Sequence, residues 1–386
     1  MKIHSRYKNN IILYIISMSL ISFATGIFLL AFNLHISVII DSKVFISNFL
    51  LVGNASMAVG GIIFGRIIDK YKKNRVLLLS TVICGMAFCG ECIMQSQLIL
   101  YALSVIYGLG YSVLMSIHTP FIMEYVEEER QPYIINLCSS IKLFASTCGT
   151  FIGGLIPLKV ISPINNSPYQ LIFILAGSIY LLGSIPLIFC INKSNNNGQH
   201  TYSIEKIEKP KLSAFSLVFL ILGLLIFFSP YMNLYFNNRY NLNLRYISII
   251  ITIIEICPVI TNVLLSKLFK WFKESDIIIV GSTLCAVSFF ALSFIEKLWI
   301  QIILFLLTTI ISSFLFPQIN RFLLKLYPEN QIGKMSGYAN FFYNIGDSIG
   351  TYSEGLFINY GIFSMPFLVA AILYIFLIHF IKNLHR

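Results

Sequence analysis

Three ionisable side chains lie near the middle of long apolar segments of the sequence: Lys142, Glu255 and Asp347. A charge at the centre of a bilayer costs about 2.5–3.5 kcal/mol, so each residue requires a partner, a water-filled cavity or a change of protonation. Asp347 has no evident cationic partner, which makes it the first candidate for a proton carrier, with Glu255 second. The alternative is a neutral, hydrogen-bonded carboxyl group that only stabilises the core.

Other titratable residues lie nearer the ends of such segments. Glu91 and Glu354 are in the outer thirds of their segments, and we expect both to be hydrated near the membrane surface. His35 and His118 titrate near neutral pH when unperturbed, yet a lone histidine close to a helix end is more often a neutral, hydrogen-bonded side chain.

The sequence predicts no cofactor and no metal. Cys89 and Cys92 form a C-x-x-C inside an apolar run, without a second cysteine pair or a histidine beside it. No H-E-x-x-H, G-x-S-x-G or P-loop motif is present. We therefore expect no catalytic residue and no enzymatic activity, and a membrane-embedded enzyme is a remote alternative.

The composition is that of a membrane protein. Of the 386 residues, 57% are hydrophobic and only 11% are charged, with a mean hydropathy of +0.81. A formal charge of +11 could indicate nucleic-acid binding. Basic residues that flank apolar segments are explained more simply by the positive-inside rule, so we expect a lipid bilayer and no nucleic acid as partner.

Twelve apolar segments are long enough to cross a hydrocarbon layer of about 30 Å as helices. The sequence thus predicts an all-α membrane protein with spans at 11–34, 44–68, 76–95, 98–123, 133–158, 169–191, 212–236, 246–269, 276–295, 298–322, 335–358 and 361–382. Loops on alternate sides differ in charge: the inner segments hold 21 of the 27 Lys and Arg residues, and the outer loops hold five. This bias predicts that both termini are cytoplasmic, in a bacterial inner membrane.

The chain is built from two related halves. The polar, basic stretch 192–211 resembles a cytoplasmic linker and separates six spans from six, which gives an N-terminal bundle at 1–191 and a C-terminal bundle at 212–386. A shift of 197 residues brings Gly149 onto Gly346, and it likewise aligns a proline and two lysines of the first half with the same residue types in the second. We interpret this as a parallel repeat.

The loop between the second and third spans carries a family signature. Residues 65–75 read GRIIDKYKKNR, which resembles the G-x-x-x-D-[RK]-x-G-[RK]-[RK] motif of the major facilitator superfamily. Lys72 stands where the second glycine of the motif usually lies. The resemblance covers the whole chain and implies two pseudo-symmetric six-helix bundles that transport a solute by alternating access. A weaker likeness, at Gly149–Gly154, is to the G-P-x-x-G-G of antiporter members, with Thr150 in place of proline.

The resemblance also implies a conformational latch formed by Gly65, Asp69, Lys70, Lys73 and Glu124. Gly65 would let two helices approach closely, Asp69 would cap the helix that begins near Met335, and Lys73 would face Glu124. The competing interpretation is that these lysines only enforce membrane topology.

In the resembled fold, spans two, five, eight and eleven line the boundary between the halves. This arrangement implies that Lys142 and Glu255 form an ion pair across the boundary, since each would offset the desolvation of the other. The substrate cavity is implied between spans one, four, seven and ten, with candidate lining residues Asn33, Tyr107, Tyr111, Tyr231, Asn233, Thr308, Ser312 and Ser313. Tyrosines near span ends, such as Tyr231, also fit an interfacial aromatic belt.

Together these features predict a monomeric, proton-coupled secondary transporter that exports a small amphipathic organic compound, such as a drug or a metabolite. An aromatic and mildly polar pocket suits such a solute. Proton-coupled uptake of a small nutrient is the alternative, because the same carboxyl groups would serve either direction.

Overall fold

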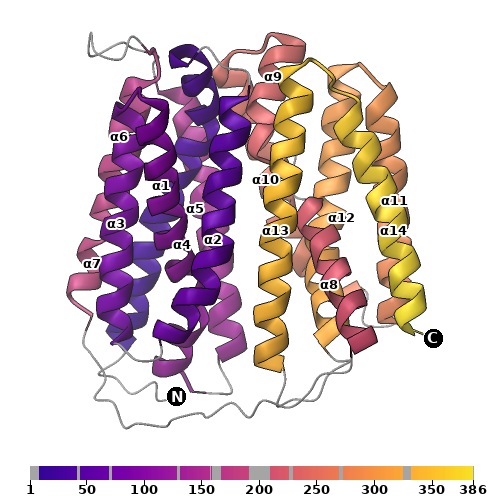
Figure 1. The fold of residues 1–386 in the computed structure, drawn as a ribbon, viewed down its shortest axis with the longest axis horizontal. Helices are drawn as coiled ribbons and strands as arrows, with labels where there is room; N and C mark the ends of the chain where they lie inside the picture. Colours follow the sequence, from indigo (N-terminus) through magenta and orange to yellow (C-terminus); the bar gives the residue numbers. More distant parts are fainter. Residues whose placement is uncertain are drawn as a thin grey trace.

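Helices account for every predicted span in the computed structural model of the chain (Figure 1). The structure describes residues 8–40, 44–68, 72–127, 131–156, 158, 167–190, 209–225, 229–268, 273–324 and 332–385. The helices of the first half are α1 Lys8–Ile39, α2 Phe45–Ile68, α3 Lys73–Ile93, α4 Gln97–Tyr125, α5 Gln131–Leu155, α6 Gln170–Leu182 and α7 Ile185–Ile188. Those of the second half are α8 Lys209–Leu224, η2 Ser229–Tyr231, α9 Met232–Tyr240, α10 Leu244–Leu268, α11 Glu274–Phe294, α12 Leu298–Leu324, α13 Ile332–Asn359 and α14 Met365–His385.

Two of the predicted spans are interrupted helices. The sixth consists of α6 and α7, which are separated at Gly183 and Ser184. The seventh contains α8, which ends at Leu224, and then the 3-10 turn η2 from Ser229 and helix α9; residues 226–228 lie outside the described residues. Proline cannot donate a backbone hydrogen bond to the preceding turn, so Pro230 favours a new helix start over a continuous helix.

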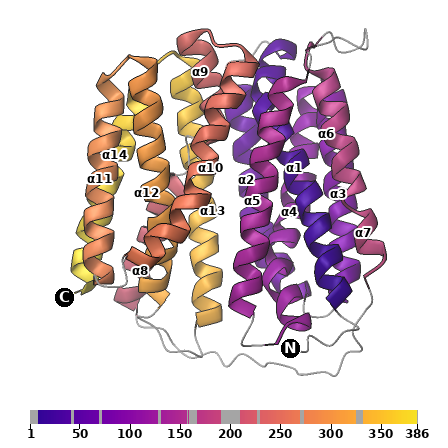
Figure 2. The same ribbon diagram turned by 180° about the vertical axis from the view of Figure 1, so that it is seen from behind.

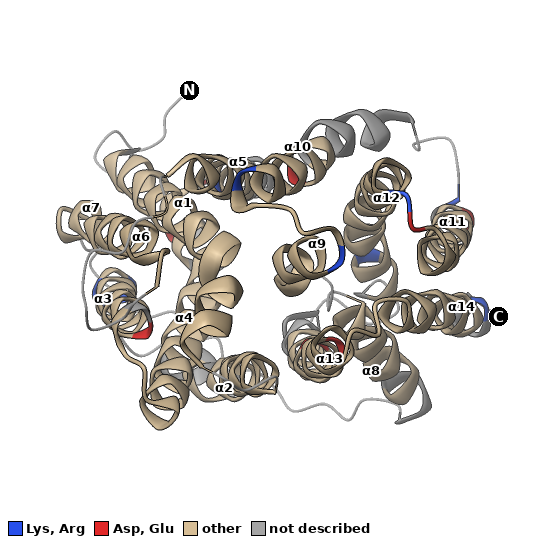
Figure 3. Ribbon diagram, turned by 90° about the horizontal axis from the view of Figure 1, so that it is seen from above, with Lys and Arg blue, Asp and Glu red and all other residues tan. Residues whose placement is uncertain are grey.

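The helices form two bundles that stand side by side, α1 to α7 in one and α8 to α14 in the other (Figures 1 and 2). The chain begins and ends at the same end of the molecule, which we call the terminal face; the opposite end, where α1 ends and α9 lies, is the far face (Figure 1). In the view onto the far face, α5 lies beside α10 and α2 beside α13 (Figure 3).

Seven helical segments of the described residues are long and apolar enough to cross a membrane, within α1, α3, α4, α6 with α7, α11, α12 and α14. The four helices that join the bundles are α2, α5, α10 and α13, of which α2 contributes a shorter apolar segment, Phe45–Gly61. These helices carry small and polar residues where they meet another helix, and α5, α10 and α13 also carry Lys142, Glu255 and Asp347. Helices α3, α6, α7, α11 and α14 lie away from the boundary between the bundles (Figure 3), and they expose large hydrophobic side chains, as a surface in contact with lipid does.

The predicted repeat is confirmed by matching helix contacts in the two bundles. A Cβ atom added to Gly149 of α5 would clash with the Phe23 carbonyl of α1, and one added to Gly346 of α13 would clash with the Leu220 carbonyl of α8. Phe23 and Leu220 are 197 residues apart, as are Gly149 and Gly346. The α1–α5 and α8–α13 pairs therefore pack backbone against backbone at equivalent positions, where only glycine fits.

Alanine at either of these glycines is expected to lower the free energy of unfolding by about 1–3 kcal/mol, because a methyl group would force the helices apart. Gly61→Ala is the matched control, since nothing lies within 4 Å of a Cβ atom at Gly61. Thermal unfolding of the purified protein in one detergent measures the difference. Equal transition temperatures for Gly149→Ala and Gly61→Ala would contradict this packing.

Candidate functional site: a cavity between the two bundles

A cavity of about 100 Å³ lies between the bundles. Both bundles line it: Gly26, Leu29 and Leu30 of α1, Ser146 and Thr150 of α5, Pro230 of η2, Asn233 of α9, and Ile251 and Glu255 of α10. The volume is enough for several water molecules. Glu255 gives this cavity an ionisable group, and Ser146, Thr150 and Asn233 supply neutral polar groups.

An amide network closes the cavity toward the far face. Asn33 Nδ2 of α1 donates hydrogen bonds to the Pro230 carbonyl at 2.6 Å and to Asn233 Oδ1 at 3.4 Å. Asn233 Nδ2 donates in return to the carbonyls of Leu29, at 3.2 Å, and Leu30, at 2.8 Å. Asn33 and Asn233 are 3% and 2% exposed. Pro230, in the 3-10 turn before α9, thus supplies the carbonyl that the first bundle binds.

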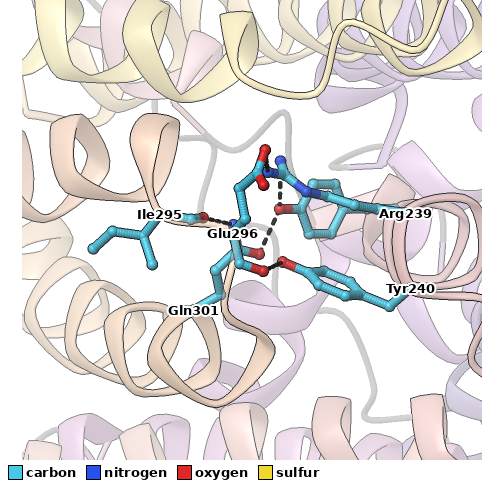
Figure 4. Close-up of polar contacts among 6 residues, drawn as sticks. Arg239, Tyr240, Ile295, Glu296 and Gln301 are labelled. Carbon is cyan, nitrogen blue, oxygen red and sulfur yellow. Dashed lines mark hydrogen bonds and ion pairs between the residues drawn. The ribbon is translucent and has the colours of Figure 1, made fainter.

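Helix α9 is held to its own bundle by a second polar cluster (Figure 4). Arg239 donates to the Tyr235 hydroxyl at 3.3 Å and lies 3.7 Å from the Glu296 carboxylate, before α12. Tyr235 donates to Gln301 Oε1, and Tyr240 donates to the Glu296 carbonyl at 2.8 Å. Because this cluster ties α9 to the α11–α12 loop, Asn233 is positioned by the second bundle as a whole.

Two further contacts join the bundles toward the far face. Gly355 of α13 leaves room for Ser47 of α2 and for the hydroxyl of Tyr231, which would both clash with a larger side chain. Gly154 of α5 likewise faces Ser248 of α10. Tyr231 is fully buried, so the aromatic-belt interpretation of this residue is wrong: its ring packs inside the contact between the bundles.

The expected ion pair between Lys142 and Glu255 is not formed, although both residues are in the described part of the chain. Thr147 interacts with Glu255, and Gly154 faces Ser248, so α5 and α10 run antiparallel in a constant register. That register places Lys142 five residues closer to the terminal face than Glu255, about 7.5 Å along the helix axis. Lys142 instead lies near Cys138 of α5 and His118 of α4.

Asp347 lies at the α8–α13 crossing, outside the cavity lining. Its Oδ1 accepts a hydrogen bond of 2.9 Å from Thr351, one turn further along α13. Gly223 of α8 allows the helix backbone to approach Asp347 directly. Asp347 is 197 residues from Thr150, so the two residues occupy equivalent positions in the repeat. The second bundle thus has a carboxyl group at the position where the first bundle has the hydroxyl of Thr150, which lines the cavity.

Part of the predicted latch is visible at the terminal face. Lys73 Nζ, at the start of α3, lies 3.0 Å from a Glu124 carboxylate oxygen at the end of α4. Gly65 is within α2, whereas Asp69 and Lys70 lie outside the described residues. Both partners are partly exposed, and such ion pairs contribute about 0–1 kcal/mol, so the contact is weak enough to break during a conformational change.

Several predicted lining residues do not line this cavity. Tyr107 and Tyr111 stack on each other with ring centroids 5.6 Å apart, and Tyr107 faces Phe88 of α3, so this side of α4 packs within its bundle. Thr308 is 2% exposed and donates back to the Phe305 carbonyl of its own helix at 2.9 Å. Ser312 and Ser313 also donate to carbonyls of α12, those of Thr309 and Ile310.

Glu91 and Glu354 are buried, whereas we expected both near the membrane surface. They are 3% and 0% exposed, because both side chains point from their helices into a bundle. The two histidines are hydrogen-bonded: His35 Nδ1 lies 2.7 Å from the Ser167 hydroxyl, and His118 Nδ1 lies 2.5 Å from the Tyr14 hydroxyl.

The sequence matches a known protein family, and the fold matches solved structures. A sequence profile of the Major Facilitator Superfamily matches residues 10–351. No match is found among curated proteins. Solved structures with the same fold include an inward-facing bacterial homologue of the human lysosomal transporter Spinster, with 10% identity, a TM-score of 0.76, and 98% of this chain and 96% of that chain covered.

Two other solved structures extend the likeness. The nucleoside transporter NupG has 13% identity and a TM-score of 0.76, with 98% of this chain and 99% of that chain covered. The human organic anion transporter MFSD10 has 11% identity and a TM-score of 0.66, with 97% and 99% covered. At these identities the likeness establishes the fold alone.

Proposed function

Because the chain belongs to the Major Facilitator Superfamily, and is therefore a multi-pass membrane transporter rather than an enzyme, we propose that it works by alternating access around the cavity between its bundles. The lining from both bundles carries this proposal: a rocking motion of one bundle against the other would expose the same groups to either side. The far-face contacts through Asn33, Asn233 and Gly355 correspond to a state closed on that side.

The coupling ion that we propose is the proton, and the direction is export of a small amphipathic organic compound. Support for the proton comes from carboxyl groups at the two bundle crossings, Glu255 in the cavity and Asp347 on α13. The alternative direction, uptake of a nutrient, would use the same groups. Glu255 favours a solute with a cationic group, because the cavity lining contains no basic residue among those described.

The location that we propose is a bacterial inner membrane, with the terminal face in the cytoplasm. The excess of Lys and Arg in the loops on the side of the termini supports this orientation. The cavity is lined by one chain, so a monomer suffices for transport.

Accumulation of a panel of amphipathic cations, anions and neutral compounds in cells with and without the chain tests the proposed function. An exported compound would accumulate less in cells that contain the chain, and a protonophore would abolish the difference. An imported nutrient would instead accumulate more. No difference for any compound, with the protein verified in the membrane, would contradict transport of this solute class.

Glu255→Gln is expected to weaken binding of a cationic exported solute about 10- to 150-fold, because a hydrogen bond to a charged group contributes about 1.5–3 kcal/mol. The concentration that gives half-maximal transport in membrane vesicles measures this loss. Glu127→Gln, which removes an exposed carboxylate after α4, is the control and should leave it unchanged. An unchanged value for Glu255→Gln would exclude contact between this carboxyl group and the solute.

A further inference from the structure

Glu354 of α13 is the most completely buried carboxyl group in the described part of the chain. Its exposure is 0%, and neither Oε1 nor Oε2 has a hydrogen-bond partner there. An ionised carboxylate in such surroundings would lose its hydration without compensation, at a cost of many kcal/mol. The neutral acid is the form that this environment tolerates.

A small cavity adjoins this carboxyl group. Its volume of about 20 Å³ is that of one water molecule. Apart from Gly350, Ser353 and Glu354 itself, the lining is apolar: Leu224 of α8, Phe357 of α13, and Pro366, Val369 and Leu373 of α14. These few oxygen atoms are too sparse for a metal cation, which takes about six oxygen ligands, but a proton requires only the carboxyl group.

A polar stripe on α13 connects Glu354 with Asp347. Asp347, Thr351 and Glu354 are spaced four and three residues apart, so they share one face of the helix. Thr351 is fully buried and already donates to Asp347 Oδ1 at 2.9 Å. Asp347 and Glu354 are about 10.5 Å apart along the helix axis. Thr351 lies between them, and its hydroxyl group can both donate and accept hydrogen bonds.

Glu354 also adjoins the far-face contact between the bundles. The next residue, Gly355, is where Ser47 of α2 and Tyr231 of η2 meet α13. Tyr231 is the titratable side chain that faces Glu354 from η2, and Tyr343 faces Asp347 on α13 itself. Separation of α2 from α13 at Gly355 would withdraw Ser47 and admit water to the Tyr231 hydroxyl, which faces Glu354.

We propose that Glu354 is a second proton-binding carboxyl group, which exchanges its proton with the far side when the contact at Gly355 opens and passes it to Asp347 through Thr351. In the closed state the O–H bond of Glu354 remains intact. On opening, this bond breaks, and the proton goes either to water or to the Thr351 oxygen, whose own proton moves at the same time to an ionised Asp347. In both cases Glu354 is left as a hydrated carboxylate, which takes up a proton from water in the reverse step. This inference rests on the proposed proton coupling, and it identifies Glu354 as the residue at which the proton enters from the far side.

Infrared spectroscopy of the purified full-length protein in lipid vesicles tests the assignment with the proton as the only probe. The wild type should show a C=O band of a protonated carboxylic acid at neutral pH that is lost in Glu354→Gln and shifted in Glu354→Asp. Glu91→Gln, which removes another buried carboxyl group, should remove a different band. An unchanged spectrum in both Glu354 variants would overturn the proposal.

The relay is tested by exchange in D₂O. Thr351→Val keeps the shape of the side chain but removes the hydroxyl, and should slow deuterium exchange of the Asp347 band about tenfold or more, whereas Thr351→Ser should not. Equal exchange rates in the two variants would exclude a path through Thr351. These readouts involve no solute: if the bands behave as expected but a pH gradient drives no transport, the proposed coupling fails and the proton site stands.

Discussion

Replacing Asn233 by leucine is expected to shift the protein from the state closed at the far face to the state open there. Asn233 makes three of the hydrogen bonds between the bundles, to the carbonyls of Leu29 and Leu30 and from Asn33. Leucine makes none of them. At about 0.5–1.5 kcal/mol for each bond, the loss amounts to roughly 2–4 kcal/mol, which changes the ratio of the two states about 30- to 1,000-fold.

Labelling of a cysteine at Thr150, a buried cavity residue, measures this shift. In a background without the native cysteines, a membrane-impermeant maleimide added at the far face should modify Thr150→Cys rapidly only when Asn233 is leucine. Asn238→Leu, on the exposed side of α9, is the matched control and should leave labelling slow. Slow labelling in both variants would show that the amide network does not hold this face closed.

Replacing Asp347 by asparagine is expected to uncouple transport from the pH gradient. Asparagine has the same shape and can accept the hydrogen bond from Thr351, yet it cannot take up a proton. One pH unit corresponds to about 1.4 kcal/mol, so one proton per solute drives a concentration ratio of about tenfold. In the Asp347→Asn variant, the solute concentrations on the two sides of the membrane should become about equal, while flux down a solute gradient continues.

Proteoliposomes with an imposed pH gradient and a transported solute test this expectation. Glu127→Gln is the control, because it also removes one carboxylate, from an exposed side chain after α4. Gradient-driven accumulation that is equal in Asp347→Asn and Glu127→Gln would refute the role of Asp347. Loss of flux in both directions would indicate a structural role at the α8–α13 crossing.

The sequence was sufficient to predict the helices and the repeat, because both follow from features that persist over many residues. Apolar length defines a span, and the shift that aligns Gly149 with Gly346 reappears as two matching glycine contacts. The interruption before α9 was missed: the segment 212–236 is predominantly apolar, and its clearest local signal is the Ser229–Pro230 pair.

The lining of the site could not be predicted in the same way, because it depends on helix rotation and on register between helices. Lys142 and Glu255 are on adjacent helices, but a five-residue offset separates them, and nothing in either segment reports that offset. Tyr107 is near the middle of a span that the family resemblance implied as cavity lining, yet it packs inside its bundle. Ser146 and Thr150 line the cavity but were not predicted to do so. Their spacing of four residues from each other and from Lys142 places all three on one face of α5, which was the available signal.

The rocking of one bundle against the other is tested most directly by pulsed electron paramagnetic resonance with two pairs of spin labels. One pair joins exposed far-face positions, Leu98 and Glu296; the other joins exposed positions near the terminal face, Arg75 and Lys382. Asn233→Leu should lengthen the first distance and shorten the second within the same molecules. A longer far-face distance with an unchanged or longer distance at the terminal face would contradict alternating access about the central cavity.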